Sequence, residues 1–306
     1  MLVEVGLFLF GLVLLVVGAD RAVTAAGELA LYYGVSTFFI GVTVVSIGTS
    51  VPEMTTSIYA ASYGAGDLVV GNIVGSETAQ ITLAIAVVAL ISPIVAQRRQ
   101  VLVYGGAMVL AMIIMFLTLE DGVLTRSEGV LMMLSYVVFV HDLYSNEGGE
   151  EIAEEALEEH EPPRRTVPWI LAGLAMVLVG GNVMVTNGVA LARIAGVPEY
   201  LLGLLTGLGT TAPEIAVAGI AARGGEGGIS VGSLLGSNIT DPVFSLGVGA
   251  LVTDVVVTDV TTVQTSMTYM IVVSLAVLLV LYWRRGIDRP TAVVCALLYL
   301  PSFVVA

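Results

Sequence analysis

Long apolar segments separated by short polar stretches run through the whole 306-residue chain. A helix that crosses the hydrocarbon core of a bilayer needs about 20 predominantly apolar residues. The pattern therefore predicts an all-α polytopic membrane protein with ten transmembrane helices. The predicted spans are residues 2–18, 36–61, 68–91, 101–118, 123–140, 167–187, 199–221, 229–252, 264–282 and 290–305.

The first five predicted spans share sequence motifs with the last five. Residues 47–53 read I-G-T-S-V-P-E and residues 208–214 read L-G-T-T-A-P-E, and the match continues downstream at an offset of 161 residues. An odd number of spans in each copy forces the second copy into the membrane upside down, as in many secondary transporters. We therefore expect two inverted five-helix repeats, residues 1–140 and 167–306, joined by an acidic loop at residues 141–166.

The second predicted span, residues 36–61, contains a proline, glycines and a glutamate that an apolar helix should not tolerate. Pro52 cannot donate a hydrogen bond to the carbonyl of Gly48, so we expect the helix to open there. A carboxylate such as Glu53 costs about 3 kcal/mol at membrane depth on insertion scales, unless it faces a polar cavity or a partner. Thr49 and Glu53 are four residues apart and share a helix face. The stretch predicts a cation site.

Composition narrows the class of protein. The chain is 57% hydrophobic and has a mean hydropathy of +0.98, which excludes an ordinary soluble domain. Its single cysteine, Cys295, excludes a disulfide framework or a zinc cluster. The first apolar segment carries Glu4 and has no basic stretch before it, so we interpret it as a retained span rather than a signal peptide.

The charged residues are unusual in kind as well as number. The net charge is −14, and every basic residue is an arginine. An excess of acids is typical of proteins from organisms with a salt-filled cytoplasm, whereas G+C-rich codon usage would produce the same preference for arginine. We favour the interpretation that the protein comes from a halophile.

Arginines orient the predicted spans. Loops after odd-numbered spans hold nine arginines, including Arg21, whereas loops after even-numbered spans hold only Arg126 and Arg193. Because cytoplasmic loops carry an excess of positive charge, both termini should lie outside the cell membrane and the central loop in the cytoplasm.

The central loop, residues 141–166, carries nine of the 25 acidic residues. A run of like charges usually marks a solvated tether, which we favour over a regulatory cation site.

A second polar motif follows each proline motif. It reads G-N-I-V-G-S-E-T-A-Q from Gly71 and G-S-L-L-G-S-N-I-T-D from Gly232, and its glycines, four residues apart, would let two helices approach closely. The polar groups of these motifs offer oxygen, which suits calcium and sodium and disfavours zinc, copper and iron. The predicted ligands are Glu53, Glu214, Asp241, Gln80, Thr49, Thr210, Ser76 and Ser237, with main-chain carbonyls freed by Pro52 and Pro213.

The paired motifs resemble the alpha repeats of the cation/calcium exchanger superfamily, and are most similar to those of prokaryotic sodium/calcium exchangers. The resemblance covers the whole chain and implies a secondary active antiporter that needs no cofactor. By alternating access, it would exchange one calcium ion for several sodium ions at overlapping sites. The resemblance also implies roles for single residues. Glu53 and Glu214 match the two essential glutamates of the family. Its calcium and sodium ligands are matched by Thr49 and Thr210 and by the main-chain carbonyls of Ser46 and Gly207. Its sodium ligands are matched by Ser76 and Ser237, and the family carries Asn or Asp at the positions of Gln80 and Asp241.

The chain departs from the pattern of the family at several points, which leaves the coupling ion open. The departures are the longer side chain of Gln80, the acid at Glu77 where an uncharged residue is common, Thr211 in place of Ser, and one residue missing before Gly209. Glu77 could carry protons in a calcium/proton antiporter. It lies about 100° round the helix from the preceding serine, however, and could instead face a neighbouring helix or lipid headgroups. Asp241, at the end of the second copy of the motif, resembles the acid that potassium-dependent sodium/calcium exchangers carry there, so a potassium-dependent exchanger is a further alternative.

An intramembrane protease is the less favoured alternative. Residues 64–67 read G-A-G-D and resemble the G-x-G-D motif of aspartyl proteases, but that chemistry needs a second aspartate, typically after a tyrosine, and no Tyr-Asp occurs. Asp67 also falls in a predicted turn, where Gly and Asp are common. We expect no enzymatic activity, no nucleic-acid partner, and a chain that could act as a monomer in the lipid bilayer.

Overall fold

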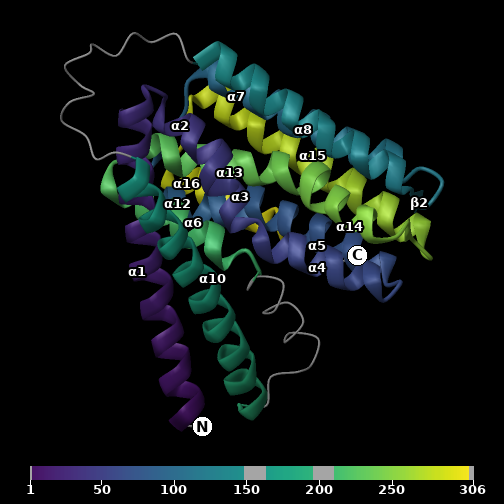
Figure 1. The fold of residues 1–306 in the computed structure, drawn as a ribbon, viewed down its shortest axis with the longest axis horizontal. Helices are drawn as coiled ribbons and strands as arrows, with labels where there is room; N and C mark the ends of the chain where they lie inside the picture. The colour runs from purple at the N-terminus through teal and green to yellow at the C-terminus, as the bar shows by residue number, and fades with distance from the viewer. Residues whose placement is uncertain (1, 148–162, 196–209, 303–306) are drawn as a thin grey trace.

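The computed structural model describes residues 2–147, 163–195 and 210–302, and these are mostly helical (Figure 1). The first half contains α1 (Leu2–Tyr33), α2 (Thr37–Ile40), η1 (Gly41–Val45), α3 (Ser46–Thr49), α4 (Val51–Ser62), α5 (Gly66–Ala79), η2 (Gln80–Ala84), α6 (Ile85–Ile91), β1 (Ile94–Val95), α7 (Arg98–Thr118), β2 (Val123–Leu124) and α8 (Arg126–Glu147). The second half contains α10 (Pro163–Ile194), α12 (Ala212–Gly224), α13 (Gly227–Thr240), η3 (Asp241–Ser245), α14 (Leu246–Val252), β3 (Val255–Val256), α15 (Val260–Arg284), β4 (Gly286–Ile287) and α16 (Arg289–Leu297). Elements labelled η are π-helical turns.

The element boundaries confirm the internal repeat at its offset of 161 residues. The first and last residues of α10 each lie 161 positions after those of α1. The same shift relates α5 to α13, η2 to η3, and α6 to α14. The short strands show how the halves are related, because β1 pairs with β4 and β2 pairs with β3, both antiparallel. Exchanging the halves converts one strand pair into the other. The halves are therefore related by a pseudo-two-fold axis, as inverted repeats require.

Five helices in the described part are long and apolar enough to cross a membrane, and the bent pair at residues 37–49 and 51–62 makes a sixth span if it counts as one. The helices at the other predicted spans are shorter or more polar, and the span predicted at residues 199–221 begins outside the described residues. The five long helices are Leu2–Tyr33, Gly66–Ile91, Arg98–Thr118, Arg164–Gly188 and Val260–Arg284.

The first span, predicted at residues 2–18, is longer than expected. α1 continues to Tyr33 and ends where Gly34 takes a positive φ of 66°. Hydropathy falls after residue 18, but the helix continues because good helix formers follow, and a left-handed glycine is what commonly ends a helix. Arg21, expected in a cytoplasmic loop, instead lies on α1 with its guanidinium carbon 5.8 Å from the centre of the Trp169 ring.

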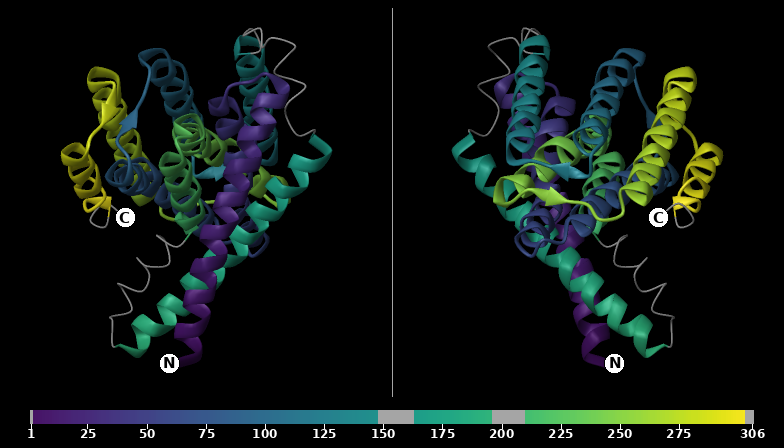
Figure 2. Two further views of the ribbon diagram at one scale, coloured as in Figure 1. Left: turned by 90° about the vertical axis from the view of Figure 1, so that its left-hand side faces the viewer. Right: turned by 90° about the vertical axis from the view of Figure 1, so that its right-hand side faces the viewer.

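α1 and α10 cross each other and project together beyond the other helices (Figure 2). Small residues let their backbones touch at the crossing. A Cβ atom on Gly18 would lie 2.7 Å from the carbonyl oxygen of Gly173, and one on Gly180 would lie 2.8 Å from that of Gly11. Larger side chains at these positions would force the two helices apart.

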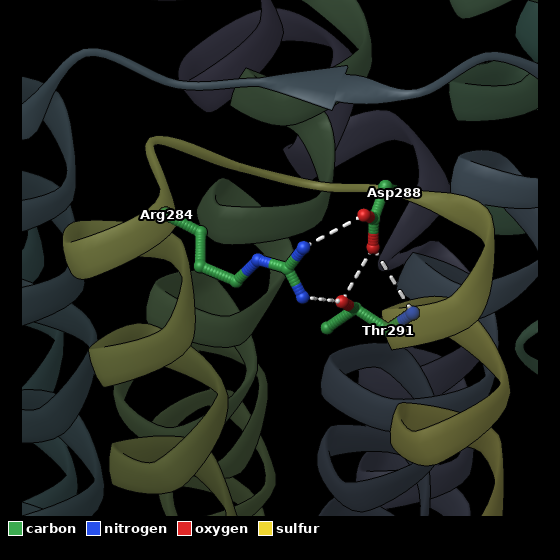
Figure 3. Close-up of polar contacts among 3 residues, drawn as sticks. All are labelled: Arg284, Asp288 and Thr291. Atoms are coloured by element: carbon green, nitrogen blue, oxygen red, sulfur yellow. Dashed lines mark hydrogen bonds and ion pairs between the residues drawn. The ribbon is translucent and has the colours of Figure 1, made fainter.

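A polar cluster fixes the loop between α15 and α16 (Figure 3). Asp288 accepts hydrogen bonds from the Arg284 side chain at 2.7 Å and from the main-chain N–H of Thr291 at 3.1 Å. The hydrogen bonds from Thr291, with the positive charge of Arg284, hold the pKa of the exposed Asp288 carboxyl below its usual value. The same loop contains β4, so the cluster helps to hold the strand that pairs with the first half.

Asp67, the aspartate of the G-x-G-D stretch, also stabilises a loop, the segment before α15. Its carboxylate accepts hydrogen bonds from the main-chain N–H groups of Thr258 at 3.0 Å and Asp259 at 3.3 Å. These contacts join the start of α5 to the segment before α15. Asp67 itself lies in the first turn of α5 and not in the turn between spans that the sequence predicts.

Candidate cation site

The second predicted span is a broken helix, as the sequence indicates. Its two helical parts, residues 37–49 and 51–62, differ in direction by 41°. The break falls at Ser50 because Pro52, in the first turn of α4, has no N–H that could donate a hydrogen bond to a carbonyl of the preceding turn. Glu53 then also lies in the first turn of α4, where free N–H groups and the helix dipole favour a negative charge.

The start of α12 in the second half resembles the start of α4. Thr211 precedes this helix, Pro213 is its second residue, and Glu214 lies in its first turn. Thr210, a predicted ligand, is half-buried just before the helix. Gly207, predicted to offer a main-chain carbonyl, lies outside the described residues, as does the turn with the missing residue.

Four carboxylates from the two halves are buried in one region. Glu53, Glu77, Glu214 and Asp241 each have 0% exposure. The oxygens of the three glutamates have no hydrogen-bond partner in the described part of the chain. Glu53 interacts electrostatically with the other three acids, so the four lie near one another. Buried negative charges without partners are costly, and they require bound cations or protons. The burial of Glu77 excludes the contact with lipid headgroups that the sequence left open.

Direct polar contacts join the two repeats at this region. Gln80 donates a hydrogen bond to Asp241 across 3.3 Å, although these residues occupy equivalent positions in the two repeats. The hydroxyl oxygens of Thr49 and Ser237 are 3.4 Å apart. Asp241 also accepts a hydrogen bond from Ser245 at 2.8 Å. Predicted site residues from both halves therefore meet around the pseudo-two-fold axis.

Glycines of the second motif allow this close approach, as predicted. α13 packs against α2, η1 and α3. A Cβ atom on Gly236 would lie 2.6 Å from the Cα of Val42, so only glycine fits there. The equivalent first-half glycines, Gly71 and Gly75, have no atom within 4 Å of the Cβ position among the described residues. The close approach predicted at these two glycines is therefore not seen within residues 2–147, 163–195 and 210–302.

Two further predicted ligands are buried but bonded within their own helices. The main-chain carbonyl of Ser46 accepts hydrogen bonds from the N–H of Ser50 at 2.9 Å and from the hydroxyl of Thr49 at 3.2 Å. The hydroxyl of Ser76 donates to the carbonyl of Ile73 at 3.1 Å. In this conformation, a cation at either oxygen would therefore share it with an existing hydrogen bond.

Sequence reasoning misses two residues of this region. Asn238 donates its amide to the side-chain oxygen of Gln80 at 2.9 Å. Tyr136, on α8, accepts a hydrogen bond from Thr240 at 3.2 Å. Aligning the repeats could have revealed Asn238, because it is the second-half counterpart of Glu77. Tyr136 carries no sequence signal, since only the packing of α8 against η3 brings it to the site.

The polar groups of this region are carboxylates, hydroxyls, amides and carbonyls, which suit hard cations. Within the described residues, no three acidic, histidine or cysteine side chains converge closely enough to hold an ion by themselves. Hydroxyl, amide and main-chain oxygens must therefore complete any binding site. Buried carboxylates between the inverted repeats of a polytopic membrane protein define the class as a secondary transporter of cations.

Comparison with known sequences gives the family. The chain matches the family described as sodium/calcium exchanger protein over residues 3–142 and 166–306. It is 33% identical over 260 residues to the putative antiporter CaxA of Alkalimonas amylolytica, with 82% of each chain covered. It is 28% identical over 344 residues to the sodium/calcium exchanger MaX1 of Methanosarcina acetivorans, with 98% of this chain and 97% of MaX1 covered. The chain belongs to the sodium/calcium exchanger family, which consists of membrane transporters and not of enzymes.

Solved structures of the sodium-calcium exchanger NCX_Mj have the same fold. A structure with neither sodium nor calcium matches with a TM-score of 0.83 and 28% identity, and 99% of both chains is covered. Another, soaked with 2.5 mM Na⁺ and 0.1 mM Ca²⁺, matches with a TM-score of 0.81 and 27% identity over 99% of this chain and 98% of that chain. These matches confirm the polytopic all-α fold with two inverted five-helix repeats.

Proposed function

We propose that this chain exchanges calcium for sodium across the cell membrane by alternating access at the buried carboxylate region. The observation that carries the proposal is the pair Glu53 and Glu214. They are fully buried at equivalent positions of the two repeats, and their carboxylate oxygens have no hydrogen-bond partner among the described residues. A calcium ion carries two positive charges, which balance the two negative charges of the ionised pair. It also coordinates carboxylate oxygens readily.

The proposal includes a ligand set and an orientation. Each half offers a glutamate, a threonine, a serine and main-chain carbonyls, so several sodium ions could replace one calcium ion. Residues 1–140 and 167–306 would form the two repeats, with residues 141–166 as a cytoplasmic loop and both termini outside. The proposed ligands are Glu53, Glu214, Asp241, Thr49, Thr210, Ser76, Ser237 and Gln80, with the main-chain carbonyls of Ser46 and Gly207.

Calcium uptake into proteoliposomes tests the role of the two glutamates. An outward sodium gradient should drive calcium into vesicles that contain the wild-type protein. Glu53→Gln and Glu214→Gln should each reduce uptake to the level of protein-free vesicles, because a neutral amide cannot balance the charge of the ion. Glu120→Gln changes an exposed acid and is the matched control, which should retain uptake.

The melting temperature of each purified variant shows whether it is folded. Wild-type uptake in a folded Glu53→Gln or Glu214→Gln protein would contradict the assignment of this pair. Complete loss in Glu120→Gln would show that the assay reports something other than the buried site.

Calcium/proton exchange is the second candidate, and the burial of Glu77 favours it. A fourth buried carboxylate could carry a proton through the transport cycle. The same vesicles distinguish the two candidates. Uptake driven by sodium at constant pH supports sodium coupling, whereas equal uptake driven by a pH gradient without sodium overturns it. A potassium gradient in a third set of vesicles tests the potassium-dependent variant.

A further inference from the structure

The hydroxyl of Tyr136 lies beside the candidate cation site without belonging to the proposed ligand set. The side chain is on α8 and is only 4% exposed. Its ring packs against Phe139 and Phe244, with 6.4 Å and 5.2 Å between the ring centres. These contacts explain an aromatic ring, but phenylalanine would satisfy them equally well. The hydroxyl needs another explanation, because a buried tyrosine hydroxyl usually serves a hydrogen bond.

Two hydroxyls from other elements meet the Tyr136 hydroxyl. Thr240, the last residue of α13, donates a hydrogen bond to it at 3.2 Å. The hydroxyl oxygen of Ser46, in α3, lies 3.4 Å from that of Thr240, and the Ser46 side chain also approaches Tyr136. All three side chains are buried. This hydroxyl cluster of Ser46, Tyr136 and Thr240 therefore joins three elements that are far apart in the chain.

Two members of the hydroxyl cluster are directly linked to proposed ligands. The proposed ligand set includes the main-chain carbonyl of Ser46 and the carboxylate of Asp241, which follows Thr240. Because the serine side chain is short, holding its hydroxyl restricts where the carbonyl of the same residue can point. The cluster therefore restrains the backbone at one proposed ligand in each repeat.

Close packing of α13 against α3 brings the hydroxyl cluster together. A Cβ atom on Gly236 would lie 2.9 Å from the Cβ of Ser46, and Thr240 lies about one helical turn after Gly236. A contact at glycine has little direction and would let the helices slide past each other, whereas hydrogen bonds depend on distance and angle. The Thr240 hydroxyl also lies 2.9 Å from the carbonyl of Gly236 in its own helix. Tyr136 adds the contact that ties this turn to α8.

The hydroxyl cluster has no counterpart at the pseudo-symmetric position. At the offset of 161 residues, the equivalents of its three members are Gly207, Leu297 and Ala79. None of these residues carries a hydroxyl, although the two repeats share one fold. Because the other repeat is built without these hydroxyls, the fold alone does not require them. Their role lies in the site that they border.

We propose that Tyr136 is a positioning residue of the cation site, whose hydroxyl holds Thr240 and Ser46 and so keeps the main-chain carbonyl of Ser46 oriented for the ion. This inference rests on the proposed function, because it takes that carbonyl as a ligand. Tyr136 does not touch the ion itself. Loss of its hydroxyl therefore weakens ion binding without removing a ligand.

Calcium titration of the purified full-length protein tests the role of Tyr136. Tyr136→Phe keeps the ring and removes the hydroxyl, and it should raise the dissociation constant of calcium by about three- to tenfold, the effect of losing one hydrogen bond between helices. Thr240→Val has nearly the same shape as the wild type and should cause a similar rise. Thr240→Ser retains the hydroxyl and should keep the wild-type value.

Tyr144→Phe is the matched control. It makes the same chemical change on the same helix, but Tyr144 is 57% exposed and packs against Phe39, with 5.9 Å between the ring centres. The dissociation constant of calcium should therefore stay at the wild-type value. A rise as large as that of Tyr136→Phe would overturn the proposal, because any tyrosine of α8 would then have the same effect.

The double variant Tyr136→Phe/Thr240→Val separates positioning from a general loss of stability. If Tyr136 acts through Thr240, the double variant should bind calcium no more weakly than the weaker of the two single variants, since each breaks the same contact. Additive effects would overturn the proposal. A merely structural role would lower the melting temperature and the maximal uptake rate but leave the dissociation constant unchanged.

An unchanged dissociation constant in folded Tyr136→Phe would overturn the positioning role. If that variant does not fold, the comparison of Thr240→Val with Thr240→Ser decides, and equal calcium binding by these two would overturn it. The uptake assay keeps the two proposals apart. Sodium-driven uptake with unchanged calcium binding in Tyr136→Phe would leave the exchange intact and overturn the positioning role alone. Weakened calcium binding in Tyr136→Phe, in a protein without sodium-driven uptake, would support the positioning role and overturn the exchange.

Discussion

Glu53 and Glu214 are tolerated inside the protein because each lies in the first turn of a helix that begins just before a proline. The N–H groups of a first turn have no helical partner, and the helix dipole there favours a negative charge. The interrupted backbone therefore lowers the cost of a buried carboxylate without neutralising it. The remaining negative charge of the carboxylate can be balanced by a bound cation.

The hydroxyl of Ser237 lies 3.4 Å from that of Thr49, in the other repeat. Ser237→Ala removes one oxygen that a sodium ion would need at this position. We expect the sodium concentration for half-maximal exchange to rise by about three- to tenfold, the effect of losing one polar contact. Calcium binding should change less, because the carboxylates dominate it. Sodium dependence of exchange and calcium titration measure the two effects.

Ser233→Ala is the matched control on the same helix. Ser233 is equally buried, but its hydroxyl donates to the carbonyl of Ser230 at 3.1 Å, within α13 itself. Its loss should leave the sodium dependence unchanged. Equal effects of Ser233→Ala and Ser237→Ala would mean that the assay reports packing of the helix and not an ion ligand. Ser76 resembles the control in this conformation, since its hydroxyl donates to the carbonyl of Ile73 within α5 at 3.1 Å. An effect of Ser76→Ala as large as that of Ser237→Ala would therefore mean that this hydrogen bond opens when sodium binds.

At the scale of elements, the π-helical turns coincide with the site. η2 begins at Gln80 and η3 begins at Asp241, the two residues that meet across the axis. Pro242 lies in η3 and removes one N–H from the helical ladder. π-helical turns occur frequently at functional sites, because the extra residue shifts the side chains that follow. Here they lie where the two repeats meet.

The packing of α13 against η1 depends on Gly236. Gly236→Ala would bring a Cβ atom to 2.6 Å from both the Cα and the carbonyl oxygen of Val42, which are backbone atoms that cannot rotate away. We expect a loss of roughly 1–3 kcal/mol in the free energy of unfolding, as for other overpacked sites. Exchange should also fall, since α13 carries Ser237 and leads into Asp241. Denaturant unfolding and calcium uptake measure both effects.

Gly106→Ala is the control for this prediction. Gly106 lies on α7 with no atom within 4 Å of the Cβ position among the described residues. Alanine there should be neutral or slightly stabilising, because it forms helix better than glycine does. A Gly236→Ala protein as stable and active as Gly106→Ala would mean that the contact between α13 and η1 is not needed.

At the scale of the whole molecule, the strand pairs agree with the alternation of the predicted spans. β1 and β4 follow the third and ninth predicted spans, and β3 follows the eighth. β2 follows the fourth, at residues where the fifth span is predicted to begin, because α8 starts only at Arg126. Loops after odd-numbered spans must share one side of the membrane, and loops after even-numbered spans must share the other. The pairings join loops of the same side in both cases.

The arginine distribution predicts which side is the cytoplasm. Ser145→Cys, near the end of α8, should react only with thiol reagents that enter the cell, and Glu120→Cys should react with reagents that stay outside. The native Cys295 is only 2% exposed, so it should contribute little background. Labelling of intact and permeabilised cells measures both. Labelling of Ser145→Cys from outside would invert the proposed orientation.

The sequence by itself determined the fold class, the repeat and most of the candidate site. Apolar segments and repeated motifs can be recognised without knowledge of contacts. A proline interrupts a helix in almost any surroundings, so the helix starts just before Glu53 and Glu214 could be predicted. Hydropathy did not determine where α1 ends. The polarity of residues 20 and 21 breaks the apolar run, but a helix with a polar surface continues until a residue such as Gly34 ends it.

Only the tertiary structure decided which side chains meet across the axis. Gln80 and Asp241 are 161 positions apart in the chain, and Tyr136 and Thr240 are 104 positions apart. No local pattern tells that either pair meets. Glu77 shows this most clearly. Its helical position left a neighbouring helix and the lipid headgroups both open, and the packing of the two repeats buried it among the other acids, because burial depends on the elements that surround a helix and not on the helix alone.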